Sequence, residues 1–367
     1  MKVLYLADPS AAHTIKWING FTSKGIETRL FGLSRPEEVQ YDPKVIIEFM
    51  DTPDNIKLKK DGSFLKTPYI RSIPRLRKII EEFQPDILHA HYASSYGLLN
   101  ALSGFHPNIL SVWGSDVFEF PRKSVLHKKI LQFNLERTDF IFSTSEYMKR
   151  ELEKYTEREI TVLPFGIDTK YFEPYEVERF FDDETTVIGI VKSMEDYYGV
   201  KYLLEAFAKV TELFPDKKLK LLVIGGGTQL DAYKNYAMSL GIGDTTHFTG
   251  YISYSDIPFY HNQIDIAVYP SLRESFGVAA LESSACEKPV ITTDIGELPN
   301  LVLDNETGFI VKHKSTDAIV DKLKILIEDE ELRIKFGKKG REFVNSNFNF
   351  NNNLTSMISF YKQIMEK

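Results

Sequence analysis

The chain has 367 residues, of which 43% are hydrophobic and 26% are charged, a balance that is typical of an ordinary soluble globular protein. This length favours two domains over one. The formal net charge of −7 and the pI of about 5.7 argue against general nucleic-acid binding, which favours a basic domain.

The N-terminal residues and the cysteine content indicate in which cellular compartment the protein resides. Residues 1–6 are too short an apolar run for a signal sequence and lead directly into Asp8, so they are predicted to form a strand. The single cysteine, Cys286, excludes an intramolecular disulfide and a cysteine-based zinc site, and it suits a reducing environment. Since no apolar run approaches transmembrane length, we expect a cytoplasmic protein.

The first half of the chain alternates strand and helix patterns. The predicted strands are 3–7, 27–32, 86–90, 108–113, 140–143 and 159–163, and the predicted helices are 14–24, 71–83 and 145–155. Strands separated by helices and short turns form βαβ units, which build a parallel sheet with helices on both faces.

The same alternation restarts after a turn-rich connector at 164–174. The predicted strands are 187–191, 218–224, 246–248, 264–269, 289–292 and 308–311, and the predicted helices are 201–213, 229–240, 278–286, 316–328 and 331–344. An Asn-rich hinge at 345–353 precedes a last helix with a stripe of apolar residues. The sequence therefore predicts an α/β protein with two doubly wound parallel-sheet domains.

A motif with two carboxylates follows the predicted strand at 264–269. Glu274 and Glu282 lie on either side of a Ser275-Phe276-Gly277 turn, and a helix begins at Val278. Such a helix start directs backbone N–H groups at a ligand above the strand, which suits a phosphate. Glu282 could then accept hydrogen bonds from a ribose diol, with Glu274 beside the far end of the ligand. The pattern favours a nucleotide-sugar site, and a solvated helix start is the alternative.

Residues 57–78 form a basic stretch in an acidic protein. Its lysines and arginines are opposed only by Asp61 and alternate with apolar side chains. Such a segment could contact an anionic membrane at its inner, cytoplasmic face, or a phosphorylated acceptor. A solvated loop and helix face is the alternative.

Several segments together resemble the GT-B fold glycosyltransferases, specifically the large family 4 of retaining enzymes. They are the Glu274…Glu282 motif, the connector 162–174 (VLPFGIDTKYFEP), 288–292 (KPVIT) with 296–299 (GELP), 305–309 (NETGF) and 85–91 (PDILHAH). The resemblance covers almost the whole chain. It implies two Rossmann-like domains facing a central cleft. Residues 1–168 would bind the acceptor, with helix 350–366 packed back on them, and 175–347 would bind the donor.

The resemblance also implies a reaction. A sugar would pass from a nucleotide-diphosphate sugar, with UDP favoured, to a glycan or lipid-linked acceptor, with retention and without a metal or other cofactor. A non-catalytic sugar-nucleotide binder of the same fold is the alternative. An epimerase would need an acid and a base carboxylate beside the sugar, and a pyridoxal-dependent phosphorylase would need a Schiff-base lysine in a far longer chain.

The diphosphate-binding segment departs from the family pattern. Many relatives place an Arg and a Lys in a Gly-Arg-Leu…Lys-Gly stretch, where this chain has Ser193 and Tyr198. Lys192, at the end of the strand 187–191, is the available cation, although a lysine cannot form the bidentate fork of an arginine. We expect Lys192 and Glu274 to be catalytic and Ser193 to contact the donor. A surface lysine at a strand end is the alternative.

Other donor contacts are implied by the resemblance. The Gly225-Gly226 turn would lie on the side of the base and ribose, and Tyr251 and Ile252 would offer backbone groups to the base. Ser275, Phe276, Gly277 and Val278, at the start of the helix 278–286, would lie along the donor as well.

The expected acceptor side departs from the family in its loops. The usual Gly-Gly loop after the first strand is replaced by residues 8–14, where His13 is a candidate acceptor contact or a helix cap. Trp113 stands where relatives often carry a histidine, and it could stack on a sugar ring. Asp116 is a candidate catalytic hydroxyl acceptor or a turn cap. His91 is a further candidate acceptor contact. With His89 it could begin a metal site, but no third ligand is evident, and we predict none.

Overall fold

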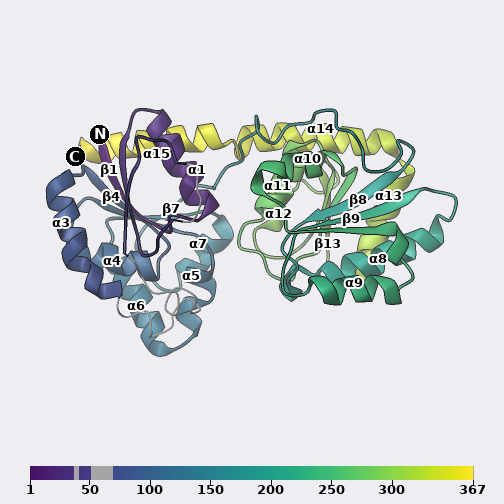
Figure 1. Ribbon diagram of the computed structural model, residues 1–367. Coiled ribbons are helices and arrows are strands. Elements are labelled where there is room, and N and C mark those ends of the chain that lie inside the picture. The colour runs from purple at the N-terminus through teal and green to yellow at the C-terminus, as the bar shows by residue number, and fades with distance from the viewer. Residues whose placement is uncertain (37–40, 51–68, 367) are drawn as a thin grey trace. The chain divides into compact units, whose positions relative to one another are not determined.

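The computed structural model describes residues 1–36, 41–50 and 69–366, which form two α/β units (Figure 1). Unit 1 comprises Met1–Phe165 and Asn351–Lys367, and unit 2 comprises Gly166–Phe350. The chain thus divides after residue 165, where the sequence placed the boundary between 168 and 175. Residues 57–68 of the basic stretch lie outside the described residues.

In its described residues, unit 1 has a seven-stranded parallel sheet in the order β3-β2-β1-β4-β5-β6-β7. Its strands are β1 (Lys2–Leu6), β2 (Glu27–Gly32), β3 (Ile46–Phe49), β4 (Ile87–His91), β5 (Asn108–Val112), β6 (Phe140–Ser143) and β7 (Ile160–Val162). Its helices are α1 (Ala12–Ser23), α3 (Ile73–Phe83), α4 (Ser95–Ser103), α5 (Ser115–Phe118), α6 (Val125–Glu136), α7 (Glu146–Leu152) and α15 (Phe350–Met365). The strand order reverses between β1 and β4, so the loops that follow these strands flank a switch point, where α/β sheets usually bind ligands.

The side chains of β1 pack on both faces of this sheet. Leu4 and Leu6 belong to a core that α3, α4 and α6 complete from one side. Tyr5 is also fully buried, but it stacks on Phe21 of α1 at 5.5 Å. Because side chains alternate along a strand, Tyr5 lies on the opposite face from its neighbours.

Helix α15 packs on the face that Tyr5 occupies (Figure 1). The Tyr361 hydroxyl lies 3.2 Å from that of Tyr5 and 2.5 Å from Nδ1 of His89. Phe360 contacts the ring of Phe142 at 4.9 Å, and Leu354, on the predicted apolar stripe, is buried. The helix predicted at 350–366 therefore contributes to the core of unit 1.

The predicted hinge at 345–353 is mostly helical. Helix α14 (Glu330–Asn347) contains its first three residues, and α15 contains residues 350–353. Asn353 donates a hydrogen bond from Nδ2 to the Pro164 carbonyl at 3.0 Å, and Phe348 and Phe350 are buried. The asparagine-rich composition suggested a hinge without regular structure, whereas most of the segment lies in α14 and α15 and its interleaved phenylalanines are buried.

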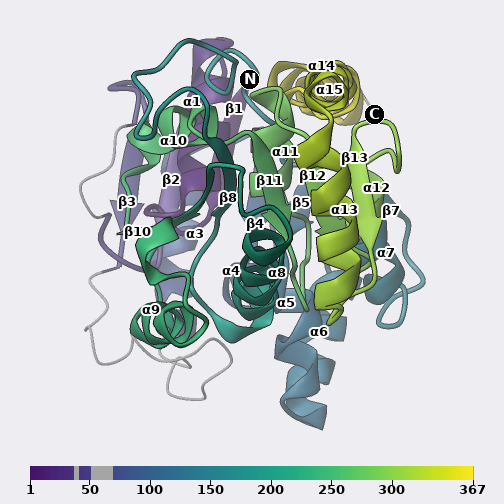
Figure 2. The same cartoon turned by 90° about the vertical axis from the view of Figure 1, so that its right-hand side faces the viewer.

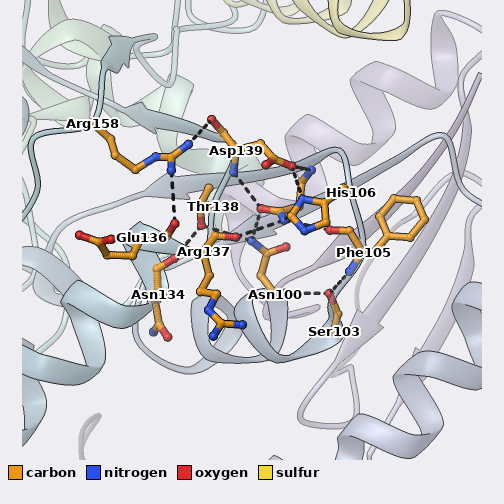
Figure 3. Close-up of polar contacts among 11 residues, drawn as sticks. Asn100, Ser103, Phe105, His106, Asn134, Glu136, Arg137, Thr138, Asp139 and Arg158 are labelled. Atoms are coloured by element: carbon orange, nitrogen blue, oxygen red, sulfur yellow. Dashed lines mark hydrogen bonds and ion pairs between the residues drawn. The ribbon is translucent and has the colours of Figure 1, made fainter. Parts of the chain in front are cut away.

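A polar network joins β5 and β6 at their N-terminal ends (Figure 3). Asp139 accepts the backbone N–H of Asn108 at 2.8 Å and contacts His106 Nδ1 at 2.7 Å. The buried Asn100 donates to the side chain of Asn108 at 2.9 Å, and Arg158 donates to the Asp139 carbonyl at 3.2 Å. These contacts lie at the edge of the sheet opposite the loops that carry the predicted site residues, so we interpret them as structural.

In unit 2, the described strands form a six-stranded parallel sheet in the order β10-β9-β8-β11-β12-β13. They are β8 (Thr186–Val191), β9 (Leu219–Ile224), β10 (Thr246–Gly250), β11 (Ile266–Tyr269), β12 (Val290–Thr293) and β13 (Gly308–Val311). The helices are α8 (Val200–Leu213), α9 (Leu230–Ser239), α10 (Ile257–Asn262), α11 (Val278–Ala285), α12 (Leu298–Leu301), α13 (Thr316–Glu328) and α14. Helices α8 and α13 lie side by side (Figure 2).

The order of the second sheet reverses between β8 and β11. Lys192 follows β8 directly, and Glu274 lies in the loop that follows β11. Two predicted catalytic residues therefore come from the strands that flank the switch point. No helix among the described residues is long and apolar enough to span a membrane.

Candidate active site

Lys192 and Glu274 form an ion pair in unit 2. The Lys192 Nζ atom lies 2.6 Å from Glu274 Oε2 and 4.2 Å from the centroid of the Tyr198 ring. The side chains of the lysine and the glutamate are only 13% and 9% exposed. Tyr198, which replaces the lysine of the family pattern, therefore supports the cation that Lys192 supplies.

Backbone contacts fix the loop that carries Glu274. The Leu272 and Arg273 N–H groups both donate to the Tyr197 carbonyl, at 2.9 and 3.2 Å. On the other side lies Gly296, where an added Cβ would come within 1.8 Å of the Glu274 carbonyl oxygen. Gly296 also has a φ of +63°, a left-handed conformation that favours glycine. Any larger residue at this position would therefore be strained and would clash with the backbone of Glu274.

Glu282 lies in α11, beyond the turn that follows Glu274. The residue is 6% exposed, and its Oε2 lies 3.5 Å from Nε2 of His261 in α10. Burial, and then the charge of Glu282, raises the pKa of the Tyr254 hydroxyl well above its usual value. The stacked rings of Tyr171 and Tyr254, 5.8 Å apart, thus lie within the field of this carboxylate. The arrangement provides a carboxylate beside aromatic side chains.

The glycine turn after β9 contacts the segment that follows Lys192. Gly226 accepts a hydrogen bond from the Met194 N–H at 2.9 Å, and the Gly225 N–H donates to the Gly250 carbonyl at 3.1 Å. Gly225 has a φ of +131°, and an added Cβ would lie 2.1 Å from the Lys192 carbonyl oxygen. Only a glycine therefore permits this close approach of the two loops.

The remaining predicted donor contacts lie in the same group of loops. Ser193 and Tyr251 are exposed, Tyr251 by 86%, and Ile252 is half-buried. At the start of α11, Ser275 and Val278 are half-buried, whereas Phe276 and Gly277 are buried. The predicted donor residues thus come from the loops after β8, β9, β10 and β11, which are consecutive in the sheet.

Unit 1 has a cavity of about 320 Å³ beside the loops that follow its central strands. It is lined by Asp8, Ala11, Leu33, Ser34, Tyr69, His91, Tyr92, Ser95, Tyr96 and Trp113. Two of the predicted acceptor residues, His91 and Trp113, are among them. His13 is not a lining residue, but its ring lies 6.0 Å from that of Trp113 in an edge-on arrangement and stacks on Phe165 at 4.0 Å.

Burial keeps the two predicted acceptor histidines neutral. It lowers the pKa of His91 to about 3, with a further contribution from His13. It lowers the pKa of His13 to about 4, with a further contribution from Lys16. His91 is 4% exposed, and its Nδ1 has no hydrogen-bond partner among the described residues. This nitrogen is therefore available to a polar group of a ligand.

His89 is committed to structural contacts instead. Its Nδ1 lies 2.5 Å from the Tyr361 hydroxyl and its Nε2 lies 2.8 Å from Oγ of Ser111. Its ring meets that of His91 edge to face at 4.7 Å. Since both nitrogens of His89 have partners, the two histidines are not arranged as a pair of metal ligands.

Asp116 shapes the loop that carries Trp113. Its carboxylate is fully buried and accepts the backbone N–H groups of Ala93 at 2.6 Å, Gly114 at 2.7 Å and Trp113 at 3.2 Å. These contacts are those of the turn cap that was the alternative interpretation. The predicted catalytic role of Asp116 stays a prediction.

Of the lining residues that were missed from the sequence, three have features that bear on function. Asp8 follows β1 in the loop that replaces the family's Gly-Gly loop, a signal that could have identified it. Tyr92 follows β4 with a φ of +83°, and its hydroxyl makes a short hydrogen bond with Ser115. A left-handed tyrosine is strained, and strain of this kind is concentrated at functional sites. Tyr96 is buried in α4 and accepts the Leu33 N–H at 3.1 Å.

Two family models match the chain, one in each unit. The family model for glycosyl transferases group 1 matches residues 172–343, and the model for glycosyl transferase 4-like proteins matches residues 2–145. The chain is 27% identical over 271 residues to an uncharacterized glycosyltransferase of Methanocaldococcus jannaschii, covering 73% of this chain and 72% of the relative. It is 25% identical over 294 residues to the N-acetyl-alpha-D-glucosaminyl L-malate synthase of Bacillus anthracis, covering 75% and 74%.

Solved structures show the same fold. Sucrose-phosphate synthase from Thermosynechococcus elongatus superposes with a TM-score of 0.80 at 18% identity, over 100% of both chains. HepE of Anabaena, in complex with UDP, superposes with a TM-score of 0.79 at 15% identity, over 99% of this chain and 100% of that one. Two Rossmann-like parallel-sheet units of this kind are the GT-B fold of sugar-transferring enzymes. The chain belongs to family 4 of the GT-B glycosyltransferases.

Proposed function

We propose that the enzyme transfers a sugar from a UDP-sugar to a hydroxyl group of a glycan or lipid-linked acceptor, with retention and without a metal. The observation that carries this proposal is the Lys192–Glu274 pair at the switch point of the unit 2 sheet. The pair presents a cation and a carboxylate together, next to the start of α11.

Lys192 and the N-terminus of α11 are suited to a departing diphosphate. In the reaction, the bond between the anomeric carbon and the diphosphate oxygen breaks, and negative charge builds on that oxygen. A fixed cation and backbone N–H groups lower the energy of this state, because they are already oriented when the charge develops. They supply charge stabilisation from the chain itself, which supports metal-independent transfer. Retention is supported by the family resemblance.

The two glutamates are suited to the two ends of the donor. Glu274 pairs with Lys192, so its free carboxylate oxygen can accept hydrogen bonds from hydroxyls of the transferred sugar. Glu282 is nearly buried beside the rings of Tyr171 and Tyr254, where a carboxylate can bind the ribose diol. The complex of the structural neighbour HepE with UDP supports uracil as the base of the donor.

The unit 1 cavity is suited to a sugar acceptor. Asp8 supplies a carboxylate for sugar hydroxyls, and Trp113, Tyr69 and Tyr92 supply aromatic surface that can stack on a sugar ring. The unpartnered Nδ1 of His91 can accept a hydrogen bond from a further hydroxyl group, because its ring is neutral at pH 7. These groups favour a carbohydrate at the recognised end of the acceptor.

A donor screen tests the proposed function. The enzyme is incubated with a panel of sugar nucleotides in the presence of EDTA, and release of the nucleoside diphosphate is measured with and without glycan acceptors. We expect turnover with a UDP-sugar that EDTA leaves unchanged, and an α-linked product from an α-linked donor by NMR. Turnover only with another base would contradict the UDP-sugar donor. Loss of activity in EDTA would contradict metal independence, and an inverted product would contradict retention.

We also infer a cytoplasmic enzyme that contacts the inner face of the membrane through residues 57–78. In the described part of this stretch, Ile70 is 45% exposed, and two arginines have protein partners. Arg75 lies 3.8 Å from Glu48, and Arg77 donates to the Leu102 carbonyl at 3.1 Å. Co-sedimentation with anionic but not with zwitterionic vesicles would support the contact. Equal recovery with both would contradict it.

A further inference from the structure

The loop after β8 continues from Lys192 into η3 (Asp196–Tyr198), a single 3-10 turn. The turn places two aromatic rings next to each other, since the ring centroids of Tyr197 and Tyr198 lie 4.5 Å apart. Each ring has one cation over it. Lys192 Nζ lies 4.2 Å from the centroid of Tyr198, and the guanidinium carbon of Arg273 lies 5.3 Å from that of Tyr197. The turn thus contacts one cation from each of the two loops that flank the switch point.

The backbone of the same turn holds the loop after β11. The Tyr197 carbonyl accepts N–H groups from two consecutive residues of that loop, at 2.9 and 3.2 Å. At Gly199, where the turn ends, φ is +67°, and an added Cβ would lie 2.0 Å from the Pro270 carbonyl oxygen. Only a glycine permits this close approach of the two loops. Because Glu274 belongs to the loop that is held here, one short segment contacts both sides of the ion pair.

An aromatic ring suits this position because it attracts a cation without adding a negative charge. Lys192 is a point charge on a flexible stem, so holding it in one place has an entropic cost. Glu274 holds the ammonium but also offsets its charge, whereas the quadrupole of a ring attracts the cation and leaves the net charge unchanged. Burial, and then the charge of Glu274, raises the pKa of the Tyr198 hydroxyl to about 12, so this side chain stays neutral at pH 7.

We propose that Tyr198 is a positioning residue for Lys192, and that its ring fixes the ammonium in the orientation in which it meets the departing diphosphate. The inference rests on the proposed role of Lys192 in stabilising that leaving group. It also assigns a function to the residue that stands in place of the lysine of the family pattern. A lysine at position 198 would bring a second ammonium close to the first, which like-charge repulsion disfavours. In this chain, position 198 supports the cation of Lys192 instead.

Two substitutions at position 198 separate the ring from the hydroxyl group. Tyr198→Phe keeps the ring and removes the hydroxyl, whereas Tyr198→Leu removes both. The Lys192 side chain is only 13% exposed, and cation–π contacts of exposed to desolvated cations correspond to about 2- to 30-fold in a rate. With the sugar nucleotide that gives the highest turnover in the donor screen, we therefore expect Tyr198→Leu to lower kcat about tenfold and Tyr198→Phe to retain it within about twofold. The donor KM should change less than about threefold in both, because the leaving oxygen gains its charge only in the transition state.

A matched control and a double-mutant cycle show whether the effect passes through Lys192. Tyr155, half-buried like Tyr198 but in unit 1, has the Nζ atom of Lys128 at 5.9 Å from its ring centroid. Tyr155→Leu should leave kcat at the parent value. In a Lys192→Ala background, Tyr198→Leu should lower kcat no further, because the group that it positions is gone. Thermal unfolding of each variant checks that the fold is retained.

NMR provides a readout that depends on neither donor nor turnover. Protons that lie over the face of an aromatic ring are shifted upfield by the ring current. The enzyme is isotopically labelled at the ε-carbon of lysine, and the signal of Lys192 is assigned by its loss in Lys192→Arg. This signal should have a similar upfield position in the parent enzyme and in Tyr198→Phe, and it should move downfield in Tyr198→Leu.

The possible results separate this inference from the proposed function. If the unaltered enzyme releases no nucleoside diphosphate from any sugar nucleotide, the proposed function fails, and the catalytic effect assigned to the ring fails with it. Turnover by the parent enzyme together with parental kcat in Tyr198→Leu would overturn the inference alone. Equal losses of kcat in the Phe and Leu variants, an undiminished effect of Tyr198→Leu without Lys192, or an unchanged Lys192 signal in Tyr198→Leu would overturn it as well.

Discussion

The Nζ atom of Lys192 lies 2.6 Å from Oε2 of Glu274, although 82 residues separate them in the sequence. Both side chains are largely excluded from water, so each charge depends on the other. The same contact that stabilises unit 2 thus fixes a cation and a carboxylate at the proposed reaction site. Activity and stability should therefore respond differently when one or both charges are removed.

Lys192→Ala should lower kcat by about 100- to 1000-fold, the range for loss of one pre-organised group that stabilises transition-state charge. It should also lower the free energy of unfolding by about 3 kcal/mol, because Glu274 is left without its partner. The double variant Lys192→Met/Glu274→Gln should regain most of the stability and stay inactive. Denaturant unfolding and nucleotide release measure the two effects. A stable and fully active Lys192→Ala enzyme would show that Lys192 does not stabilise the leaving diphosphate. Arg273 or the N-terminus of α11 would then be the candidate for that role.

Glu282→Ala should weaken UDP binding by about 1.5–3 kcal/mol, the range for a hydrogen bond that involves a charged group. Glu274→Ala should instead lower kcat, because the proposed function places this residue beside the transferred sugar. Calorimetry with UDP and steady-state kinetics distinguish the two outcomes. Glu331→Ala, at an exposed position of α14, is the matched control and should change neither quantity. If both active-site variants bind and turn over like the parent enzyme, our interpretation of the motif is wrong.

Of the described strands, all but β3 were predicted from the sequence, whereas several helices were missed. Short apolar runs such as 187–191 identify buried parallel strands, because both faces of such a sheet are covered. Helices α4 and α6 were missed for a physical reason. Most of α4 is buried, so it lacks a polar face, and the exposed Val125 and Leu126 at the start of α6 blur its apolar stripe.

The residues of the site were more predictable than the contacts between them. The strand–turn–helix context pointed to Glu274 and Glu282, and the end of a strand pointed to Lys192; the structure pairs Lys192 with Glu274. Their pairing depends on β8 and β11 being neighbours, a property of the sheet order that local patterns do not contain. The contact of His261 with Glu282 could not be predicted, because it depends on how the short helix α10 packs beside α11.

The neutral histidines of unit 1 predict sensitivity to acid. The pKa of His91 is lowered to about 3 and that of His13 to about 4, from an ordinary value of 6.5. Below pH 6.5 the unfolded chain binds protons that the folded chain does not, so stability is lost as the pH falls. Each histidine should lower the free energy of unfolding by about 2 kcal/mol at pH 5.

Thermal unfolding between pH 7.5 and 5 measures this effect. The variant His13→Asn/His91→Asn should show a clearly shallower fall in Tm than the parent enzyme over this range. The quantity compared is the slope of Tm against pH, because a general loss of packing in the variant lowers Tm at every pH and leaves this slope unchanged. Parallel slopes would show that other groups account for the acid sensitivity.

Asp8→Asn should raise the KM for the acceptor about tenfold and leave the donor KM unchanged, if the unit 1 cavity binds sugar hydroxyls. Asp8 is exposed, so the substitution should not alter thermal unfolding. Glu27→Gln, exposed at the opposite end of the sheet, is the control. Kinetics with a glycan acceptor that supports turnover provide the measurement. An increase in donor KM alone would exclude Asp8 from acceptor binding.

Helix α15 should be required for the fold of unit 1. Tyr361 is fully buried and its hydroxyl contacts both Tyr5 and His89, so Tyr361→Phe leaves two buried polar groups without a partner. We expect the free energy of unfolding to fall by about 1–3 kcal/mol. Thr355→Ala, on the exposed side of the helix, should have little effect.

Deletion from Asn352 onward should be more severe, because it removes Leu354, Met357 and Tyr361 from the core together. The newly exposed apolar surface, which includes Phe21 and Phe142, should increase binding of a hydrophobic dye and reduce solubility as well as activity. A truncated chain that stays soluble and unfolds at the parent Tm would show that unit 1 does not depend on α15. That result would also contradict the assignment of this helix to the N-terminal domain, since its buried side chains would then contribute nothing to the stability of that domain.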